Sequence, residues 1–355
     1  MTLLQDKASS DSQAIAFDSI PVIDLVDIRS SDTNTRQVLA NQVRDACINV
    51  GFFYVKNHGI PEDVISNALE MSKRFFDLPL ESKMKIENKT TANFKGYAPL
   101  LSANNDSEGS GDLHEGLQFG WEEIDQSTGP RGEDIDGAMT GANVWPTEIP
   151  NFRETVLTYY HAAVQLGKLL FPIFALALEL PEDFFEDKVG VQVLFVIDST
   201  WFESSIKTRY SAAIMSLLHY PPQTGHVDDR VIGIGAHTDW ECFTILWQEP
   251  GIQALQVLNT SNQWVNAPPT EGALVINLGD QFARWTNDVF KSTVHRAINR
   301  SGVRRYSVPL FFGTDYNVKL EPIPSCVSSS RPPKYEVITA GEYVKMRFQA
   351  AYGQK

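Results

Sequence analysis

Residues 233–248 read GIGAHTDWECFTILWQ, and this segment carries the first indication of the fold. Its residues are β-branched, aromatic or small and lack helical spacing, so the segment predicts a strand with its turn. His237 and Asp239 stand two positions apart, and side chains alternate between the two faces of a strand. We therefore expect the imidazole and the carboxylate to point the same way, as two ligands of one metal ion would.

A second histidine in a strand-like setting, His295, lies downstream in the run KSTVHRAIN. Two imidazoles and one carboxylate on one face of an octahedron leave the opposite face open, which is the ligand set of non-haem Fe(II) oxygenases. With 7 histidines in 355 residues, a His-x-Asp triplet arises by chance about 0.45 times, so the triplet alone proves little. Its weight depends on the residues around it.

The strand-like run RRYSVPLFF begins close after His295 and contains Arg305 and Ser307. The period of two places these residues on one face of the predicted strand. A guanidinium and a hydroxyl on one face can hold a carboxylate, through two parallel hydrogen bonds from the arginine and a third from the serine. This pair therefore predicts a site for a carboxylate ligand beside the metal.

Together, His237-x-Asp239, His295 and Arg305-x-Ser307 resemble, in order and spacing, the 2-oxoglutarate- and iron(II)-dependent dioxygenases. The resemblance is to the branch of isopenicillin N synthase, ACC oxidase and the flavonoid and gibberellin oxidases. It implies that His237, Asp239 and His295 hold Fe(II), that 2-oxoglutarate takes two of the open positions and that O₂ takes the third. It further implies that 2-oxoglutarate is decarboxylated to succinate and CO₂ while a small-molecule substrate is hydroxylated, desaturated or cyclised.

The resemblance also assigns roles around the co-substrate. Arg305 and Ser307 would bind the distal carboxylate of 2-oxoglutarate, and Tyr220 in LLHYPP matches a family tyrosine near its other end. Leu218 stands where family members often have asparagine, which is a departure from the pattern. Two alternatives stay open: an oxidase of the isopenicillin N synthase or ACC oxidase type that needs no keto acid, and a metal-free binding protein on this fold.

Three residues are predicted to line the substrate pocket. Glu241 and Phe243 follow the strand phase of His237 and Asp239, and Phe119 lies in HEGLQFGW (114–121), where the family carries an acidic-aromatic strand. The remaining histidines near these motifs are expected to stay away from the metal: His114 facing solvent, His219 on the opposite strand face from Tyr220, and His226 in a turn-rich loop.

The composition limits the classes of protein to which this chain can belong. The net charge of −14 argues against binding of nucleic acid, which needs clustered lysine and arginine. The longest apolar run, residues 169–178, is too short to span a bilayer. The N-terminus lacks a signal pattern, and the three cysteines are odd in number and widely spaced, as in a reducing compartment. We expect a cytoplasmic enzyme with no membrane partner.

The element pattern predicts a mainly β protein with flanking helices and a double-stranded β-helix (jelly-roll) core. Short strands separated by Gly, Pro, Asn and Asp turns fill the chain from residue 213. Helical spacing covers 33–50, ended by Gly51, and 152–180, interrupted by Pro172; the C-terminal residues return to a helical pattern.

The predicted organisation has three parts: a flexible N-terminus over 1–18, an N-terminal helix and strand region over 19–145, and the catalytic core over 146–355, which together form one structural unit. Residues 191–211 exceed the family pattern and contain Trp201 and Phe202. This insertion is expected to close over the substrate, to form a subunit contact, or to be an ordinary hairpin packed on the outside. Pocket identity in this fold depends on such loops, so the sequence does not name the substrate.

Overall fold

Two β-sheets face each other in the computed structural model, which describes residues 16–91, 93–102, 112–124, 142–189, 212–223 and 233–352. The larger sheet has eight strands in the order β1 (Val22–Asp24), β2 (Phe52–Lys56), β10 (Ala273–Leu278), β7 (Phe243–Gln248), β12 (Arg305–Phe312), β5 (Ala213–Tyr220), β4 (Glu115–Gly120) and β3 (Gly96–Ala98). The smaller sheet has the order β6 (Ile234–His237), β11 (His295–Ala297), β8 (Leu255–Leu258) and β9 (Trp264–Asn266). Among the described strands, all pairs are antiparallel except β1 and β2, which confirms the predicted jelly roll.

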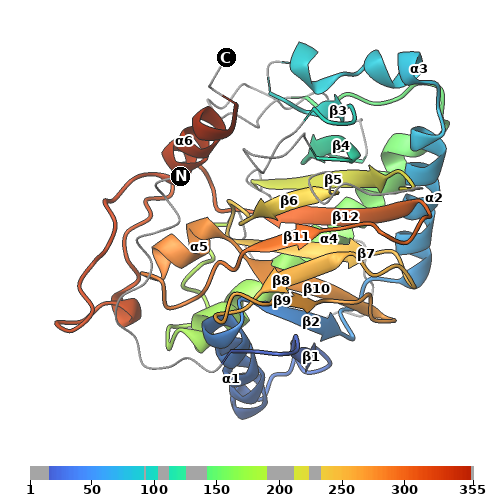
Figure 1. Cartoon of the computed structure of the whole chain (residues 1–355). Coiled ribbons are helices and arrows are strands. Elements are labelled where there is room, and N and C mark those ends of the chain that lie inside the picture. Colours follow the sequence, from blue (N-terminus) through green and yellow to red (C-terminus); the bar gives the residue numbers. More distant parts are fainter. Residues whose placement is uncertain are drawn as a thin grey trace.

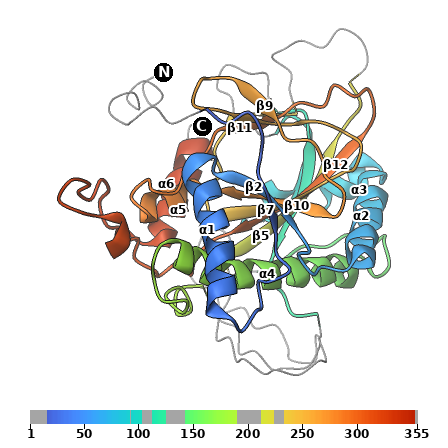
Figure 2. The ribbon, with the colours of Figure 1, turned by 90° about the horizontal axis from the view of Figure 1, so that it is seen from below.

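Helices cover the larger sheet on the side away from the smaller one. Figure 2 shows α4 (Phe152–Ala177) running across one side of the strands, with β9 and β11 on the other side. α1 (Thr33–Asn49) and α2 (Glu62–Phe76) pack against α4. At the two ends of the strands lie α3 (Leu80–Met84) with α2, and α5 (Asp280–Trp285) with α6 (Ala340–Tyr352) (Figure 1).

The apolar helix α4 belongs to the core. Its Phe171 and Phe174 pack against Phe243 of β7, with ring centroids 5.3 and 5.2 Å apart. Phe243 in turn stacks on Phe312 of β12, and Gly167 brings the α4 backbone close to that ring. By length and composition α4 could cross a membrane, but 67% of its most apolar window is buried inside the protein, as in the core helix of a globular fold.

Side-chain alternation along β12 separates the core from the interior of the β-barrel. Tyr306, Val308, Leu310 and Phe312 belong to the core under the helices. Arg305, Ser307, Pro309 and Phe311 point the other way and line a cavity between the two sheets. The period-two prediction for Arg305 and Ser307 is therefore confirmed, because β12 is one unbroken strand of eight residues.

The segment 233–248 contains a strand and a turn, as predicted, but the strand alternation that we extended to Glu241 and Phe243 does not continue through the turn. β6 ends at His237 in the smaller sheet, β7 begins at Phe243 in the larger sheet, and a turn over 238–242 connects them. The turn is held from outside: its Asp239 and Trp240 carbonyls accept the first backbone N–H groups of α5. A strand that crosses between sheets must break its pairing, so the period of two is lost after His237.

Other predicted elements are confirmed. α1 begins at the N-cap Asp32, and Gly51 follows it with φ +74°, where an added side chain would meet the Lys291 carbonyl. The helical pattern over 152–180 forms α4, with Pro172 inside it. The residues 1–15, most of the predicted loop over 102–143, the insertion 191–211 and His226 lie outside the described residues.

Candidate functional site

Two histidines and one aspartate converge in the cavity between the sheets. His237 at the end of β6 pairs in register with His295 at the start of β11, and their rings lie 4.3 Å apart. Asp239 Oδ1 lies 3.6 Å from His237 Nε2 and 3.7 Å from His295 Nε2. One ligand atom from each residue lies within 4.8 Å of the others, so the three can hold one metal ion.

Hydrogen bonds to the atoms that face away from the proposed metal position orient all three side chains. His237 Nδ1 lies 2.7 Å from the Gly235 carbonyl, and His295 Nδ1 lies 3.1 Å from the Thr293 carbonyl. Because a carbonyl only accepts, both Nδ1 atoms carry the proton and both Nε2 atoms present lone pairs to the cavity. Metal-binding histidines are typically held in this way.

The carboxylate of Asp239 is fixed in the same manner. Its Oδ2 accepts hydrogen bonds from Thr244 Oγ1 at 2.5 Å and from Asn277 Nδ2 at 2.6 Å, which leaves Oδ1 for the metal. Thr244 and Asn277 face each other on β7 and β10. Neither residue was predicted from the sequence, and no motif marks them, because only the pairing of these two strands brings them under Asp239.

A buried arginine lines the same cavity. Arg305 is 1% exposed, its guanidinium carbon lies 4.6 Å from the centre of the Tyr220 ring, and its Nη2 is 3.4 Å from Gln248 Oε1. The hydroxyls of Tyr220 and Ser307 lie 3.3 Å apart beside it. Nε and Nη1 of Arg305 make no hydrogen bond, and within the described ranges no carboxylate pairs with this side chain.

An unpaired, buried guanidinium is costly unless a ligand completes it. The cavity that it faces is also lined by His237, Asp239 and His295, and much of its wall is apolar, including Leu218, Leu246, Leu255 and Pro309. The chemistry of this donor set therefore fits a small carboxylate that reaches from the arginine to a metal ion. Sequence motif and geometry agree on this point.

The family is shown by comparison with known proteins. The model of the 2OG-Fe(II) oxygenase superfamily matches residues 202–314, and the N-terminal model described as non-haem dioxygenase in morphine synthesis matches residues 20–148. The chain belongs to the 2OG-Fe(II) oxygenases. It is 36% identical over 344 residues to the 2-oxoglutarate-Fe(II) type oxidoreductase hxnY of Emericella nidulans, covering 94% of this chain and 90% of hxnY.

Further relatives support the same family assignment. Homoarginine-6-hydroxylase 2-ODD-C23 of Glycine max is 32% identical, with 87% of this chain and 90% of that protein covered. A full-length Neurospora crassa protein crystallised in complex with alpha-KG superposes with a TM-score of 0.78 at 27% identity, covering 94% of this chain and 96% of the Neurospora chain. These likenesses favour the 2-oxoglutarate-dependent oxygenase over the alternatives left open by the sequence.

The charges of this oxygenase site are arranged for metal binding. Burial, together with the neighbouring His237, lowers the pKa of His295 to about 4, so this imidazole is neutral at pH 7. Burial works against the charged form of Asp239 as well, but the adjacent His295 and His237 outweigh it and hold the pKa of the carboxyl well below its usual range. A neutral imidazole and an ionised carboxylate are the forms that bind Fe(II).

The predicted substrate residues Phe119 and Phe243 are wrong. Phe119 is fully buried and packs against Trp145 and Tyr160, with ring centroids 5.1 and 5.9 Å away. On β4 it is the neighbours Gly116 and Gly120 that face the interior, where added side chains would meet Leu218 and Ile214 of β5. The side chain of Phe119 therefore points to the other face of β4 and belongs to the core, as does that of Phe243.

We predicted Glu241 as a pocket residue by extending the strand alternation of His237 and Asp239. Glu241 instead lies in the turn over 238–242, where that alternation does not apply. Its carboxyl reaches over Gly313, just past the end of β12, where any side chain would collide with it. Burial, assisted by the charge of Asp239, raises the pKa of Glu241 to about 8. The residue is close to the metal site, but the described cavity around the metal does not include it.

Two further histidines have defined places. His219 lies on the opposite face of β5 from Tyr220, as predicted, where it bonds Glu115 at 2.8 Å and stacks on Tyr306. The expectation that His114 faces solvent is wrong. Its Nδ1 lies 2.9 Å from the Gly233 carbonyl and its ring lies 5.9 Å from that of Tyr220, because residues 112–114 run beside β6.

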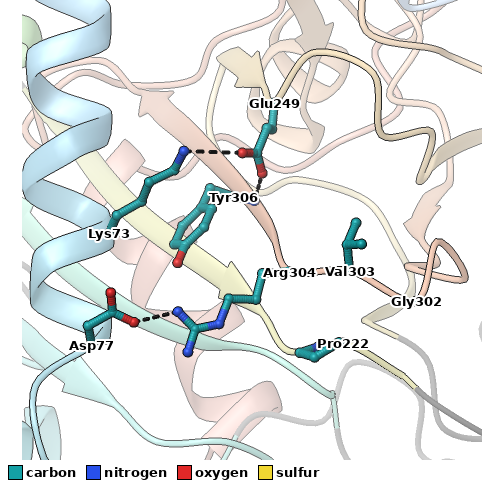
Figure 3. Close-up of a pocket in the computed structure, with 8 residues that line it drawn as sticks. All are labelled: Lys73, Asp77, Pro222, Glu249, Gly302, Val303, Arg304 and Tyr306. Carbon is teal, nitrogen blue, oxygen red and sulfur yellow. Dashed lines mark hydrogen bonds and ion pairs between the residues drawn. The ribbon is translucent and has the colours of Figure 1, made fainter.

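A larger groove of about 450 Å³ lies on the outer face of β12, and Figure 3 shows its lining. Its charges already pair with one another: Lys73 Nζ lies 3.5 Å from Glu249, and Arg304 bonds Asp77. Glu249 also accepts the backbone N–H of Tyr306 at 2.8 Å. These ion pairs connect the end of α2 to residues beside the outer face of β12. Because the charged groups of the groove are already paired with one another, we assign the reactive site to the inner cavity.

Proposed function

We propose that His237, Asp239 and His295 hold Fe(II), and that Arg305 with Ser307 binds the distal carboxylate of 2-oxoglutarate. The observation that carries this proposal is the guanidinium of Arg305, which is buried, lacks a carboxylate partner in the described structure and faces the same cavity as the three ligands. When bound, iron and keto acid supply the oxidant: O₂ is reduced, 2-oxoglutarate becomes succinate and CO₂, and one substrate C–H bond is oxidised.

The chain itself orients the reactants and excludes water. The planar fork of Arg305, supported by the Tyr220 ring, sets the direction of the keto acid toward the metal. Ser307 and Tyr220 add hydroxyls at the same end. The apolar wall around the cavity keeps the charged groups in a low dielectric, where their interactions are stronger.

The oxygenase family acts on small-molecule substrates, and we propose that the substrate of this chain is a small polar molecule. Two glycines at one end of the larger sheet support this. Gly120 leaves room for the Lys95 ammonium, 3.1 Å from where a Cβ would lie, and Gly313 leaves room for Glu241. β5 alone separates β4 from β12, so the ammonium of Lys95 and the carboxyl of Glu241 lie at the same end of the sheet.

Two related proteins suggest the first candidates. Homoarginine carries acidic and basic groups and is named in the Glycine max relative; thymine is bound in a structure of the Neurospora crassa protein, with a TM-score of 0.77 at 26% identity. Each compound is added to the enzyme with Fe(II), O₂ and 2-oxoglutarate, and succinate is measured. A substrate raises succinate formation and is itself oxidised in a one-to-one ratio.

The proposed co-substrate role has its own test, which needs no substrate. Fe(II) is titrated into the protein without oxygen, 2-oxoglutarate is added, and the visible charge-transfer absorption of a chelated keto acid is recorded. We expect the band to appear at one equivalent of each. Absence of the band, with oxidation at full rate in the absence of any keto acid, would assign the protein to the isopenicillin N synthase type.

We also propose that the protein works in the cytoplasm. Support comes from Cys47, Cys242 and Cys326, which are all buried and free, as in proteins of reducing compartments. Microscopy of the tagged full-length chain in its source cells tests this, and accumulation in a secretory or organellar compartment would contradict it.

A further inference from the structure

The strand that carries His237 is weakly supported by its own sheet. β6 has four residues, lies at the edge of the smaller sheet and pairs only with β11 among the described strands. Its pairing with β11 is interrupted between His295 and Ala297. Gly235 within this short edge strand and Gly233 just before it add backbone freedom. A metal ligand needs a fixed position, so something outside the sheet must hold β6.

The segment 112–114, just before β4, supplies that support. Asp112 is 2% exposed, and its Oδ1 accepts the backbone N–H of Gly235 at 2.8 Å. His114 Nδ1 donates to the Gly233 carbonyl at 2.9 Å. Two side chains thus take the place of a neighbouring strand along the free edge of β6.

The bond from Asp112 continues to the metal ligand through a single peptide residue. Gly235 donates its N–H to the Asp112 carboxylate and accepts the Nδ1–H of His237 with its own carbonyl, at 2.7 Å. The two bonds belong to adjacent peptide groups that share the Cα atom of Gly235, and a bond to a carboxylate is among the stronger ones. Moving Asp112 would therefore move the acceptor that sets the orientation of the imidazole.

We propose that Asp112 is a positioning residue for the iron ligand His237, acting through the backbone of Gly235, with His114 as a second support at Gly233, just before the strand. The proposal rests on the metal role of His237 proposed above. Asp112 does not contact the metal; it fixes the direction in which Nε2 of His237 presents its lone pair. Residues in this outer position typically change metal affinity by about 10- to 100-fold when they are removed.

The test compares Asp112→Ala with Asp112→Asn in the full-length chain. Fe(II) binding is measured by calorimetry without oxygen, and the keto acid absorption band is recorded at saturating Fe(II). For Asp112→Ala we expect a Kd for Fe(II) raised at least about tenfold and a shifted or weakened band. Asparagine keeps an oxygen acceptor of the same length, so Asp112→Asn is expected to keep the Kd within about threefold of wild type.

Tyr54→Phe is the matched control. Tyr54 is buried, and its hydroxyl donates to the Pro268 carbonyl at 2.6 Å, so this variant also loses one buried side-chain hydrogen bond to backbone. Tyr54 does not line the metal cavity. We expect a lower melting temperature with an unchanged Kd for Fe(II), which separates loss of stability from loss of positioning.

Two outcomes would overturn the proposal: a folded Asp112→Ala variant with the wild-type Kd for Fe(II) and an unchanged band, or equal losses of affinity in the alanine and control variants. If Asp112→Ala does not fold, Asp112→Ser replaces it, because serine is polar but too short to reach the Gly235 N–H, and the same comparison applies. A wild-type protein that binds no Fe(II) would instead refute the metal role of His237 itself.

Discussion

Replacing Arg305 by leucine tests the co-substrate site most directly. Two donors, Nε and Nη1, have no partner among the described residues, while Nη2 lies 3.4 Å from Gln248. Hydrogen bonds to charged groups contribute about 1.5–3 kcal/mol each, so losing two of them weakens the binding of 2-oxoglutarate by about 3–6 kcal/mol. At 1.4 kcal/mol per factor of ten, the Kd rises by about 10²- to 10⁴-fold.

Two companion variants sharpen the result. Arg305→Lys should recover about tenfold at most, because a single ammonium cannot reproduce two parallel bonds from a planar group. Arg304→Leu is the matched control, since Arg304 is the preceding residue in the chain but points outward and pairs with Asp77 (Figure 3). We expect this control to bind 2-oxoglutarate as the wild type does.

The assay is an anaerobic titration of the Fe(II)-loaded protein with 2-oxoglutarate, followed by the visible absorption of the chelated keto acid. The Kd for Fe(II) alone is measured first and should be the same in all variants, because Arg305 is not a metal ligand. The reasoning would be refuted if Arg305→Leu bound 2-oxoglutarate within about threefold of wild type, since the keto acid carboxylate would then lie elsewhere.

Three further predictions concern the surroundings of the site. Thr244→Val removes one hydrogen bond to Asp239 and should raise the Kd for Fe(II) about tenfold in calorimetry; an unchanged Kd would contradict this role. Phe119→Ala should lower the free energy of unfolding by about 3–5 kcal/mol in a denaturant titration without changing Fe(II) or 2-oxoglutarate binding. A change in substrate KM without loss of stability would instead indicate that Phe119 lines the substrate pocket. Lys168 is buried, its Nζ has no hydrogen-bond partner among the described residues, and burial, partly offset by Asp315, lowers its pKa to about 8 from 10.5. Lys168→Met should therefore raise the free energy of unfolding at pH 7 by about 3 kcal/mol. The wild type should gain stability between pH 8 and 10.5, where only the unfolded chain stays protonated, and a variant with the same pH dependence would count against this view.

The chemistry of the site could be predicted from the sequence because it depends on residue types. Imidazole and carboxylate bind iron, and guanidinium binds carboxylate, whatever fold surrounds them. The period of two placed Arg305 and Ser307 correctly, since β12 is a single long strand inside one sheet. Helix α1 was predictable for a similar reason: its N-cap, apolar spacing and terminal glycine are all local signals.

The same period failed where the chain changes sheets. Between His237 and Phe243 the backbone leaves one sheet and enters the other, so Glu241 and Phe243 lost the phase assigned to them. Phe119 failed differently: the strand was correct, but which of its two faces meets the helices depends on how β4 is placed beside β5. Alternation alone cannot say which face of a strand is the inner one.

Local sequence was enough to establish the ligand set, the carboxylate-binding arginine and the family resemblance. Which residues hold those ligands in place became visible only in the folded chain: Thr244 and Asn277 under Asp239, and Asp112 behind the strand of His237. These supports come from β7, β10 and the segment before β4, which lie far apart along the chain. Their positions follow from strand pairing and sheet packing, and no local pattern of side chains encodes a contact that forms only when distant segments meet.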